Sequence, residues 1–261
     1  MKLPLYQVDA FTDKLFSGNP AAVCLLENWL PDELMQSIAM ENNLSETGFV
    51  VPRGADFEIR WFTPVAEVDL CGHATLGAAH VFFNHLGHQG NEIRFHSLSG
   101  VLPVRKHGDV LTLDFPADHI EPTEILPLFI DALKLKPVEA HKGRSDYLLV
   151  FEDESQIRRL KPDFSVLSGL ESSGVIVTAR GSEADFVSRY FAPQFGIDED
   201  PVTGSAHTTL TPYWAGVLGK NELTAIQVSR RSGYLQCKHL GERVEISGKA
   251  KTYLEGEISV E

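Results

Sequence analysis

Two short segments of the chain place the same kinds of polar and small residues at the start of a predicted helix. One segment runs from Asp69 to Ala74 (DLCGHA), and the other runs from Asp200 to Ala206 (DPVTGSA). Backbone N–H groups at a helix N-terminus are unpaired and carry partial positive charge, and a glycine there lets a ligand approach the backbone closely. Two such ends can bind one anion, or each can be an ordinary capped turn.

The cysteines and histidines show no spacing that is typical of a metal site. Cys24, Cys71 and Cys237 are too few and too scattered for a disulfide framework, and the histidines form no HExxH motif. The usual phosphate-binding loops are also missing. We therefore expect no metal and no organic cofactor. Cys71 is a candidate for an acidic thiol, because it lies at the start of a predicted helix.

The two polar segments belong to a longer repeat. The sequence from Phe57 (FEIRWFTPVAEVDLCGHATLGAAHVFFNHLG) resembles the sequence from Phe186 (FVSRYFAPQFGIDEDPVTGSAHTTLTPYWAGVLG). Matching phenylalanines, prolines and glycines recur in the same order, and a Ser-Gly pair follows in both copies. A similarity of this length indicates a duplication, not a short-period solenoid.

Each copy is predicted to contain strands, then a helix, then a hairpin or meander. The segments EIRWFTP and FVSRYFAP alternate as strands do, and apolar residues at helical spacing predict helices over residues 74–86 and 206–218. Both helices are expected to end at a glycine, Gly87 in the first copy and Gly219 in the second.

An earlier helix is predicted over residues 31–42, because it starts with Pro-Asp-Glu and an acidic first turn suits the positive end of a helix dipole. We expect this helix to pack on the first sheet. Residues 154–160 are the candidate for its counterpart in the second half. Prolines and acidic residues break the strand pattern over residues 116–123. We therefore place the halves at residues 1–118 and 119–249.

Composition excludes several classes of partner. The chain has 261 residues, and its formal net charge is −13, which argues against binding to a phosphate backbone. Asp9 interrupts the N-terminal apolar stretch, so the first residues do not resemble a secretory signal, and no run approaches the ~20 apolar residues of a membrane span. We expect a cytoplasmic protein with a small-molecule partner, no nucleic acid and no membrane.

Five segments together resemble the successive signatures of the PhzF-like phenazine-biosynthesis family. They are VDAFT (8–12), GNPAAV (18–23), SETGFV (45–50), DLCGHAT (69–75) and EDPVTGSAH (199–207). The resemblance implies an α+β, diaminopimelate-epimerase-like fold, with two similar halves that each curve a mixed or antiparallel sheet around a central helix. It also implies that a C-terminal strand, about residues 250–261, joins the first half, and that no cofactor is needed.

The same resemblance assigns roles to individual residues. Glu46 matches the family's acid/base glutamate, which takes a proton from carbon and returns it elsewhere, provided that partial burial tunes its proton affinity. His73 and Asp200 match polar partners that bind substrate groups or relay protons. The donors at the two helix starts are matched by Gly72, Gly204 and Ser205.

Several of these residues have a purely structural alternative. Glu46 can be an exposed carboxylate at a strand start, and His73 can cap a helix or lie in the core. Asn19 is either a turn residue or a ligand to the substrate. His207 lies three residues into its predicted helix and can point into the core, so we give it no catalytic role.

The resemblance implies an isomerase that shifts a hydrogen or a double bond in a small carboxylate-bearing molecule, with the site in the cleft between the halves. Nothing in the sequence selects the substrate, and a homodimer is compatible with this interpretation. One alternative is an amino-acid racemase or epimerase, since related epimerases use two facing cysteines. Cys71 can occupy the first position, but Thr203 occupies the second. The other alternative is a binding or scaffold protein that retains the fold.

Overall fold

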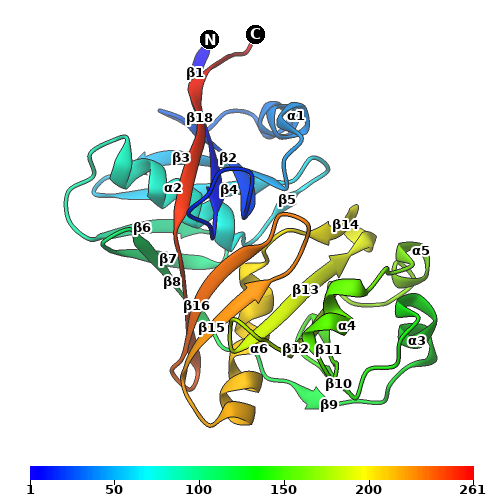
Figure 1. Cartoon of the computed structure of the whole chain (residues 1–261). Helices are drawn as coiled ribbons and strands as arrows, with labels where there is room; N and C mark the ends of the chain where they lie inside the picture. The colour runs from blue at the N-terminus through cyan, green and yellow to red at the C-terminus, as the bar shows by residue number, and fades with distance from the viewer. The chain divides into compact units, whose positions relative to one another are not determined.

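The computed structural model describes all residues from Met1 to Glu261, and the chain divides into two compact units (Figure 1). Unit 1 consists of Met1–Asp114 and Ser247–Glu261, and unit 2 consists of Phe115–Ile246. Both units combine a mixed sheet with a few helices, which confirms the predicted α+β class. None of the helices is both long and apolar enough to cross a bilayer.

Unit 1 forms one mixed sheet around helix α2. Its elements are β1 (Lys2–Ala10), β2 (Asn19–Leu25), α1 (Asp32–Asn42), β3 (Glu46–Arg53), β4 (Asp56–Phe62), β5 (Glu67–Val68), α2 (Gly72–Asn84), β6 (Glu92–Ser97), β7 (Gly100–His107), β8 (Val110–Pro116) and β18 (Ala250–Ser259). Strand β1 pairs antiparallel with β2, β2 pairs parallel with β3, β3 antiparallel with β4, and β4 parallel with β6. An antiparallel meander of β6, β7 and β8 follows.

Unit 2 repeats this order of pairings. Its elements are β9 (Glu121–Pro122), α3 (Pro127–Leu133), β10 (Glu139–Lys142), β11 (Asp146–Val150), α4 (Glu154–Arg159), α5 (Phe164–Leu167), β12 (Gly174–Arg180), β13 (Phe186–Ala192), a 3₁₀ turn (Pro193–Phe195), β14 (Ile197–Asp200), α6 (Gly204–Leu218), β15 (Glu222–Gln227), β16 (Gly233–His239) and β17 (Arg243–Gly248). Strands β10 and β11 are antiparallel, β11 and β12 parallel, β12 and β13 antiparallel, and β13 and β15 parallel. This agreement confirms the duplication seen in the sequence.

Helices α2 and α6 occupy equivalent places in the two repeats, and each begins two residues before the predicted start. The apolar pattern begins at Ala74 and Ala206, whereas the helices begin at Gly72 and Gly204. Periodicity misses a first turn whose N–H groups have no partner within the helix. The predicted end at Gly219 is confirmed, since this residue is the left-handed C-cap of α6. Helix α2 ends earlier, at Asn84.

The first helix packs as the sequence predicted. Met35, Ile38 and Ala39 are the buried residues of α1, and they share one hydrophobic cluster with Phe49 and Phe62 of the sheet. Helix α2 is more deeply buried, and small or apolar residues cover nearly its whole circumference. Such a helix is stable only inside a core. Figure 1 shows α2 among the strands of unit 1 and α6 among the strands of unit 2.

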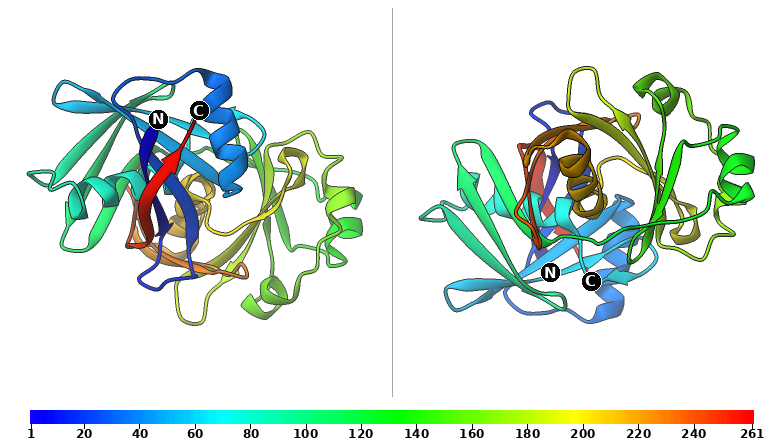
Figure 2. Two further views of the ribbon diagram at one scale, coloured as in Figure 1. Left: turned by 90° about the horizontal axis from the view of Figure 1, so that it is seen from above. Right: turned by 90° about the horizontal axis from the view of Figure 1, so that it is seen from below.

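The C-terminal strand β18 belongs to unit 1. It pairs antiparallel with β1 from Lys2 opposite Ser259 to Ala10 opposite Ala250, with one irregularity between Gln7 and Val8. The amino group of Met1 donates a hydrogen bond to the carbonyl of Val260. Accordingly, the two ends of the chain lie side by side in both views of Figure 2.

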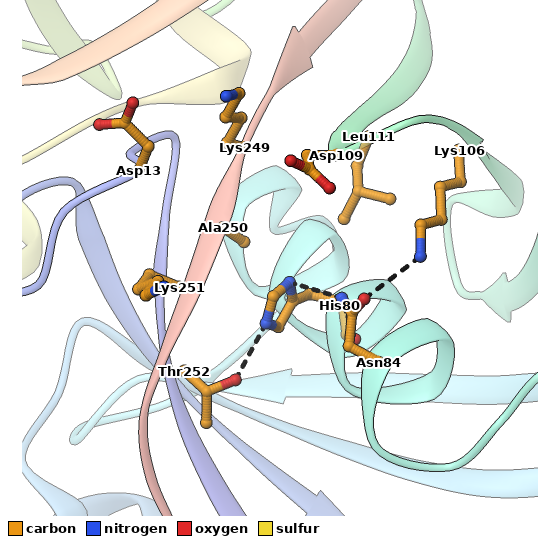
Figure 3. A pocket seen from close by; sticks show the side chains of 10 residues that line it. All are labelled: Asp13, His80, Asn84, Lys106, Asp109, Leu111, Lys249, Ala250, Lys251 and Thr252. Atoms are coloured by element: carbon orange, nitrogen blue, oxygen red, sulfur yellow. Dashed lines mark hydrogen bonds between the residues drawn. The ribbon is translucent and has the colours of Figure 1, made fainter.

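A directional series of hydrogen bonds also ties β18 to α2 (Figure 3). Lys106 Nζ donates to Asn84 Oδ1 at 3.2 Å, so the Asn84 amide nitrogen faces His80 Nδ1 at 3.0 Å. The other ring nitrogen, Nε2, then carries the proton and donates to Thr252 Oγ1 at 2.9 Å. Burial lowers the pKa of His80 to about 4, which keeps the ring neutral as this arrangement requires.

Helix α6 contains a second buried neutral histidine. His207 Nδ1 donates to the carbonyl of Thr203 at 2.8 Å, and its ring lies 6.0 Å from that of Phe186. The side chain is fully buried, and burial lowers the pKa of His207 to about 4. It therefore points into the core of unit 2.

Substitutions at two buried glycines test how closely the interior of each unit is packed. A Cβ on Gly174 of β12 would lie 2.3 Å from the phenol of Tyr190, which is pinned by a hydrogen bond to Asp146. We expect Gly174→Ala to lower the free energy of unfolding by about 1–3 kcal/mol in urea titrations. Gly77→Ala in α2 is the control, because its Cβ would meet Val8 at an ordinary 3.6 Å. Equal stability of both variants would contradict this packing.

The buried His207 should make stability depend on pH. Its pKa is about 4 in the fold and ordinary when unfolded, so only the unfolded chain takes up this proton between pH 6.5 and 4. Stability therefore falls as the pH falls through this window, by up to about 3 kcal/mol. We expect His207→Asn to reduce the slope of the profile in urea titrations across this range, with the contribution of the buried His80 retained, and the exposed His119→Asn to leave the slope unchanged. A similar slope in His207→Asn would exclude this residue as the cause.

Candidate active site

Three polar side chains meet at the start of α2 in unit 1. Glu46 is the first residue of β3, His73 is the second residue of α2, and Asn19 is the first residue of β2. Parallel pairing of β2 with β3 brings Glu46 opposite Ala21 and therefore close to Asn19. His73 and Asn19 are buried, and the Glu46 side chain is 13% exposed. The exposed-carboxylate alternative for Glu46 thus does not match its environment.

Hydrogen bonds fix the orientation of the His73 ring. Ser45 Oγ donates to Asn19 Oδ1 at 3.2 Å, so the Asn19 amide nitrogen donates to His73 Nδ1 at 3.1 Å. In this arrangement the proton of the neutral ring lies on Nε2. If the Asn19 amide rotates, its oxygen accepts from Nδ1 of a charged ring and its nitrogen donates to Ser45. The pair can therefore serve both protonation states of His73.

Glu46 and His73 face each other without completing a hydrogen bond. Glu46 Oε2 lies 3.1 Å from His73 Nε2, but the two atoms are not aligned, and neither has another hydrogen-bond partner. Buried polar atoms without partners are rare and costly in folded proteins. The ion pair is the one contact that these two atoms make, so each keeps a position at which it can bond a further group.

The charge of Glu46 also affects its neighbours. Burial opposes protonation of His73, but Cys71 and Glu46 together outweigh it and hold the pKa of His73 above its usual value. Burial, and then the charge of Glu46, raise the pKa of Cys71 to about 11. Because that thiol is uncharged near neutrality, we attribute the raised pKa of His73 to the Glu46 carboxylate. The alternative of an acidic thiol at Cys71 is not supported, since burial outweighs the helix end.

Glu46, Cys71 and His73 also form a group that could be considered for a metal. Their ligand atoms lie within 4.8 Å of one another. However, the ring nitrogens of His73 face different neighbours: Nε2 faces Glu46, whereas Nδ1 faces Asn19 and lies 3.5 Å from Cys71 Sγ. One ion cannot use both nitrogens of one ring. The arrangement therefore suits hydrogen bonding better than a closed tetrahedral site.

Unit 2 places Asp200 just before the start of α6. Asp200 ends β14 and is buried, and its Oδ2 accepts a hydrogen bond from Thr203 Oγ1 at 2.5 Å. Gly204 is the first residue of the helix and is buried, while Ser205 is exposed. The structure thus groups Asp200, Gly204 and Ser205 in unit 2 and groups Asn19, Glu46, Gly72 and His73 in unit 1.

Neither central helix has a side-chain cap at its N-terminus. Cys71 is the N-cap of α2 and Thr203 is the N-cap of α6, and neither side chain accepts a hydrogen bond from the first turn. No acidic residue lies in either first turn. In α6 the first N–H groups therefore have no partner in the N-cap side chain, whereas in α2 the N–H of Ala74 faces the Cys71 thiol; the uncapped N–H groups can accept an anionic ligand.

One residue of this region was missed by the sequence analysis. Gln227, at the end of β15, is fully buried and bonds both Asp200 and Thr203. The strand alternates buried and less buried positions, and Gln227 shares the buried set with Leu223 and Ala225. A lone glutamine at the buried phase of an apolar strand is the signal that could have identified it.

The thiols of the chain do not match a two-cysteine site in either unit. Thr203 occupies the N-cap of α6, where Cys71 stands in α2. Cys237 is buried in β16, and burial raises its pKa to about 12. A second cysteine acid is therefore missing from the start of α6.

Comparison with known proteins agrees with the repeat and with the fold. The family model described as phenazine biosynthesis-like protein (PhzC-PhzF) matches residues 8–256. An uncharacterised isomerase of Pseudomonas aeruginosa is 54% identical over 258 residues, covering 99% of each chain. An uncharacterised isomerase of Halalkalibacterium halodurans is 45% identical, again covering 99% of each chain.

Solved structures extend this agreement to the fold. A PhzF-family protein of Enterococcus faecalis has a TM-score of 0.97 and 49% identity, with all of both chains covered. A probable proline racemase of Agrobacterium radiobacter, 8% identical with a TM-score of 0.68, shares the fold alone over 99% of this chain and 93% of its own. The predicted α+β, diaminopimelate-epimerase-like fold class is confirmed. By sequence and by structure, this chain belongs to the PhzC-PhzF family of phenazine biosynthesis-like proteins.

Proposed function

We propose that the protein is a cofactor-independent isomerase that moves a proton within a small carboxylate-bearing molecule. The observation that carries this proposal is the pair of buried, unpartnered atoms Glu46 Oε2 and His73 Nε2, 3.1 Å apart beside an uncapped helix end. The relatives whose names describe them as isomerases support the reaction class.

In this mechanism Glu46 is the acid and the base. Its carboxylate takes a proton from a carbon next to an activating group, so a C–H bond breaks, an O–H bond forms and the electron pair moves into the conjugated system. Glu46 then returns the proton to another carbon on the same face, which shifts the double bond. Both steps balance without an oxidant or a reductant, and the partly buried carboxylate suits general acid–base catalysis.

His73 is proposed to stabilise the charge that develops in the substrate. Its Nε2 proton points to the region of Glu46 without being used by it, so it can be donated to a substrate oxygen. The Asn19 and Ser45 contacts keep the ring in place throughout. Preorganised donors of this kind can lower a barrier by about 3 kcal/mol each.

The helix end at Gly72 in unit 1 and the helix end at Gly204 in unit 2 are each proposed as a binding site for a substrate carboxylate, with Ser205 and Asp200 as further polar contacts in unit 2. Support comes from the uncapped first turns of both helices and from the repetition of the segment in the sequence. The Ser205 hydroxyl makes no hydrogen bond within the protein and is exposed, so it is available to a ligand.

Neither alternative function fits the site as well. A two-cysteine racemase needs a thiol at the start of α6, where Thr203 stands. A scaffold has no use for a buried acidic side chain and a buried histidine that lie 3.1 Å apart without an aligned hydrogen bond. The proposal includes a cytoplasmic location, a homodimer and a small-molecule partner, without nucleic acid or membrane.

Replacement of Glu46 by glutamine tests the proposed base. Glu46→Gln keeps the size of the side chain but removes the basic site, so turnover should fall ~100-fold or more while binding is retained. A panel of small unsaturated carboxylates, followed by NMR for deuterium uptake from heavy water, would supply the assay. The exposed Glu41→Gln on α1 is the control. Near-normal exchange by Glu46→Gln would remove Glu46 from the mechanism.

Replacement of Ser205 by alanine should have a different kind of effect. The hydroxyl is a donor that the substrate and the transition state use alike, so Ser205→Ala should raise KM about tenfold and change kcat little. Steady-state kinetics with a carboxylate that passes the deuterium assay would measure both constants. A fall in kcat without a change in KM would contradict a binding role for Ser205.

A further inference from the structure

We propose that Gln227 is a positioning residue that keeps the start of α6 open for the substrate by holding the Thr203 hydroxyl on Asp200. This inference rests on the proposed role of that helix end as a carboxylate site. It concerns a residue that touches neither the substrate nor the reacting atoms.

The amide of Gln227 is held by three hydrogen bonds. Its Oε1 accepts from the backbone N–H of Thr203 at 2.8 Å, which places Nε2 on the other side. Nε2 then donates to the backbone carbonyl of Asp200 at 2.8 Å and to Thr203 Oγ1 at 3.1 Å. These contacts use the amide in one orientation only, and the side chain is fully buried. Gln227 therefore clamps the turn between Asp200 and Thr203.

These hydrogen bonds determine the partners of the Thr203 hydroxyl. Threonine at an N-cap usually accepts a hydrogen bond from the second or third N–H of its helix. Here Thr203 Oγ1 accepts from Gln227 and donates to Asp200 Oδ2, and no cap bond forms. A residue well suited to cap α6 is thus kept from capping it. The N–H groups of Ser205 and Ala206 are left without a side-chain partner.

Strand pairing on both sides holds the backbone of Gln227 in place. It pairs with Ser188 of β13 on one side and with Gly233 of β16 on the other, inside the sheet of unit 2. A strand residue with neighbours on both sides cannot shift easily. An apolar side chain of similar length would fill the same space but would release the Thr203 hydroxyl.

A double-mutant cycle separates this role from simple support of the fold. Gln227→Met should weaken binding of anthranilate, used as the carboxylate probe in calorimetry, about tenfold, because the released Thr203 hydroxyl competes for the helix N–H groups. In the Thr203→Val background the same change should have less than about a twofold effect, since no hydroxyl is present to cap. Thr203→Ser should behave like the wild type. Gln236→Met, an exposed glutamine of β16, is the matched control.

Losses of anthranilate affinity that simply add for Gln227→Met and Thr203→Val would overturn the proposal.

Hydrogen exchange of the unaltered protein gives a second test that needs neither variant nor ligand. We expect the Thr203 amide to be protected by Gln227 and the Ser205 amide to exchange freely. A protected Ser205 amide would refute the open helix end even if a variant failed to fold. If the wild type does not bind anthranilate, the carboxylate proposal fails, and the exchange pattern still decides the role of Gln227.

Discussion

The buried helix N-terminus is the constraint on which the rest of each unit depends. A helix inside a sheet must satisfy its backbone groups, yet α2 and α6 both begin without a side-chain cap. Their first residues are small, which lets the turn before each helix pack closely, and their remaining lengths are apolar enough to be buried. The sheets around them supply the polar side chains that surround these starts, from β2 and β3 in unit 1 and from β14 and β15 in unit 2.

Burial disfavours the charged form of the titratable groups near these helices, but a neighbouring charge decides whether the pKa of a buried histidine falls or rises. His207 has only a backbone carbonyl as partner, so burial keeps its ring neutral. His73 is just as buried, but the Glu46 carboxylate lies beside it and favours the charged ring. The same carboxylate makes Cys71 harder to ionise. One acidic side chain therefore raises the pKa of His73 in unit 1, whereas His207 in unit 2 has no such partner and its pKa is lowered.

The sequence predicted the repeated architecture because the duplication preserves both the apolar periodicity and the glycines before each helix. It also predicted a helix that begins next to His73, but the 3.1 Å contact between Glu46 and His73 depends on the contact of α2 with β3 and was not predictable from spacing. The acidic thiol stayed open as an alternative for Cys71 because helix position was visible in the sequence and burial was not. Gln227 was overlooked because alternation within its strand suggested only an apolar core.

The pairing of β1 with β18 joins residues from opposite ends of the chain, such as Lys2 and Ser259. Closing so large a loop carries a high entropic cost, and contacts this distant in sequence form slowly during folding. During synthesis, all the residues of unit 2 leave the ribosome before those of β18. The edge of β1 therefore stays exposed through most of translation, and the unit that begins first in the chain is the last to be completed.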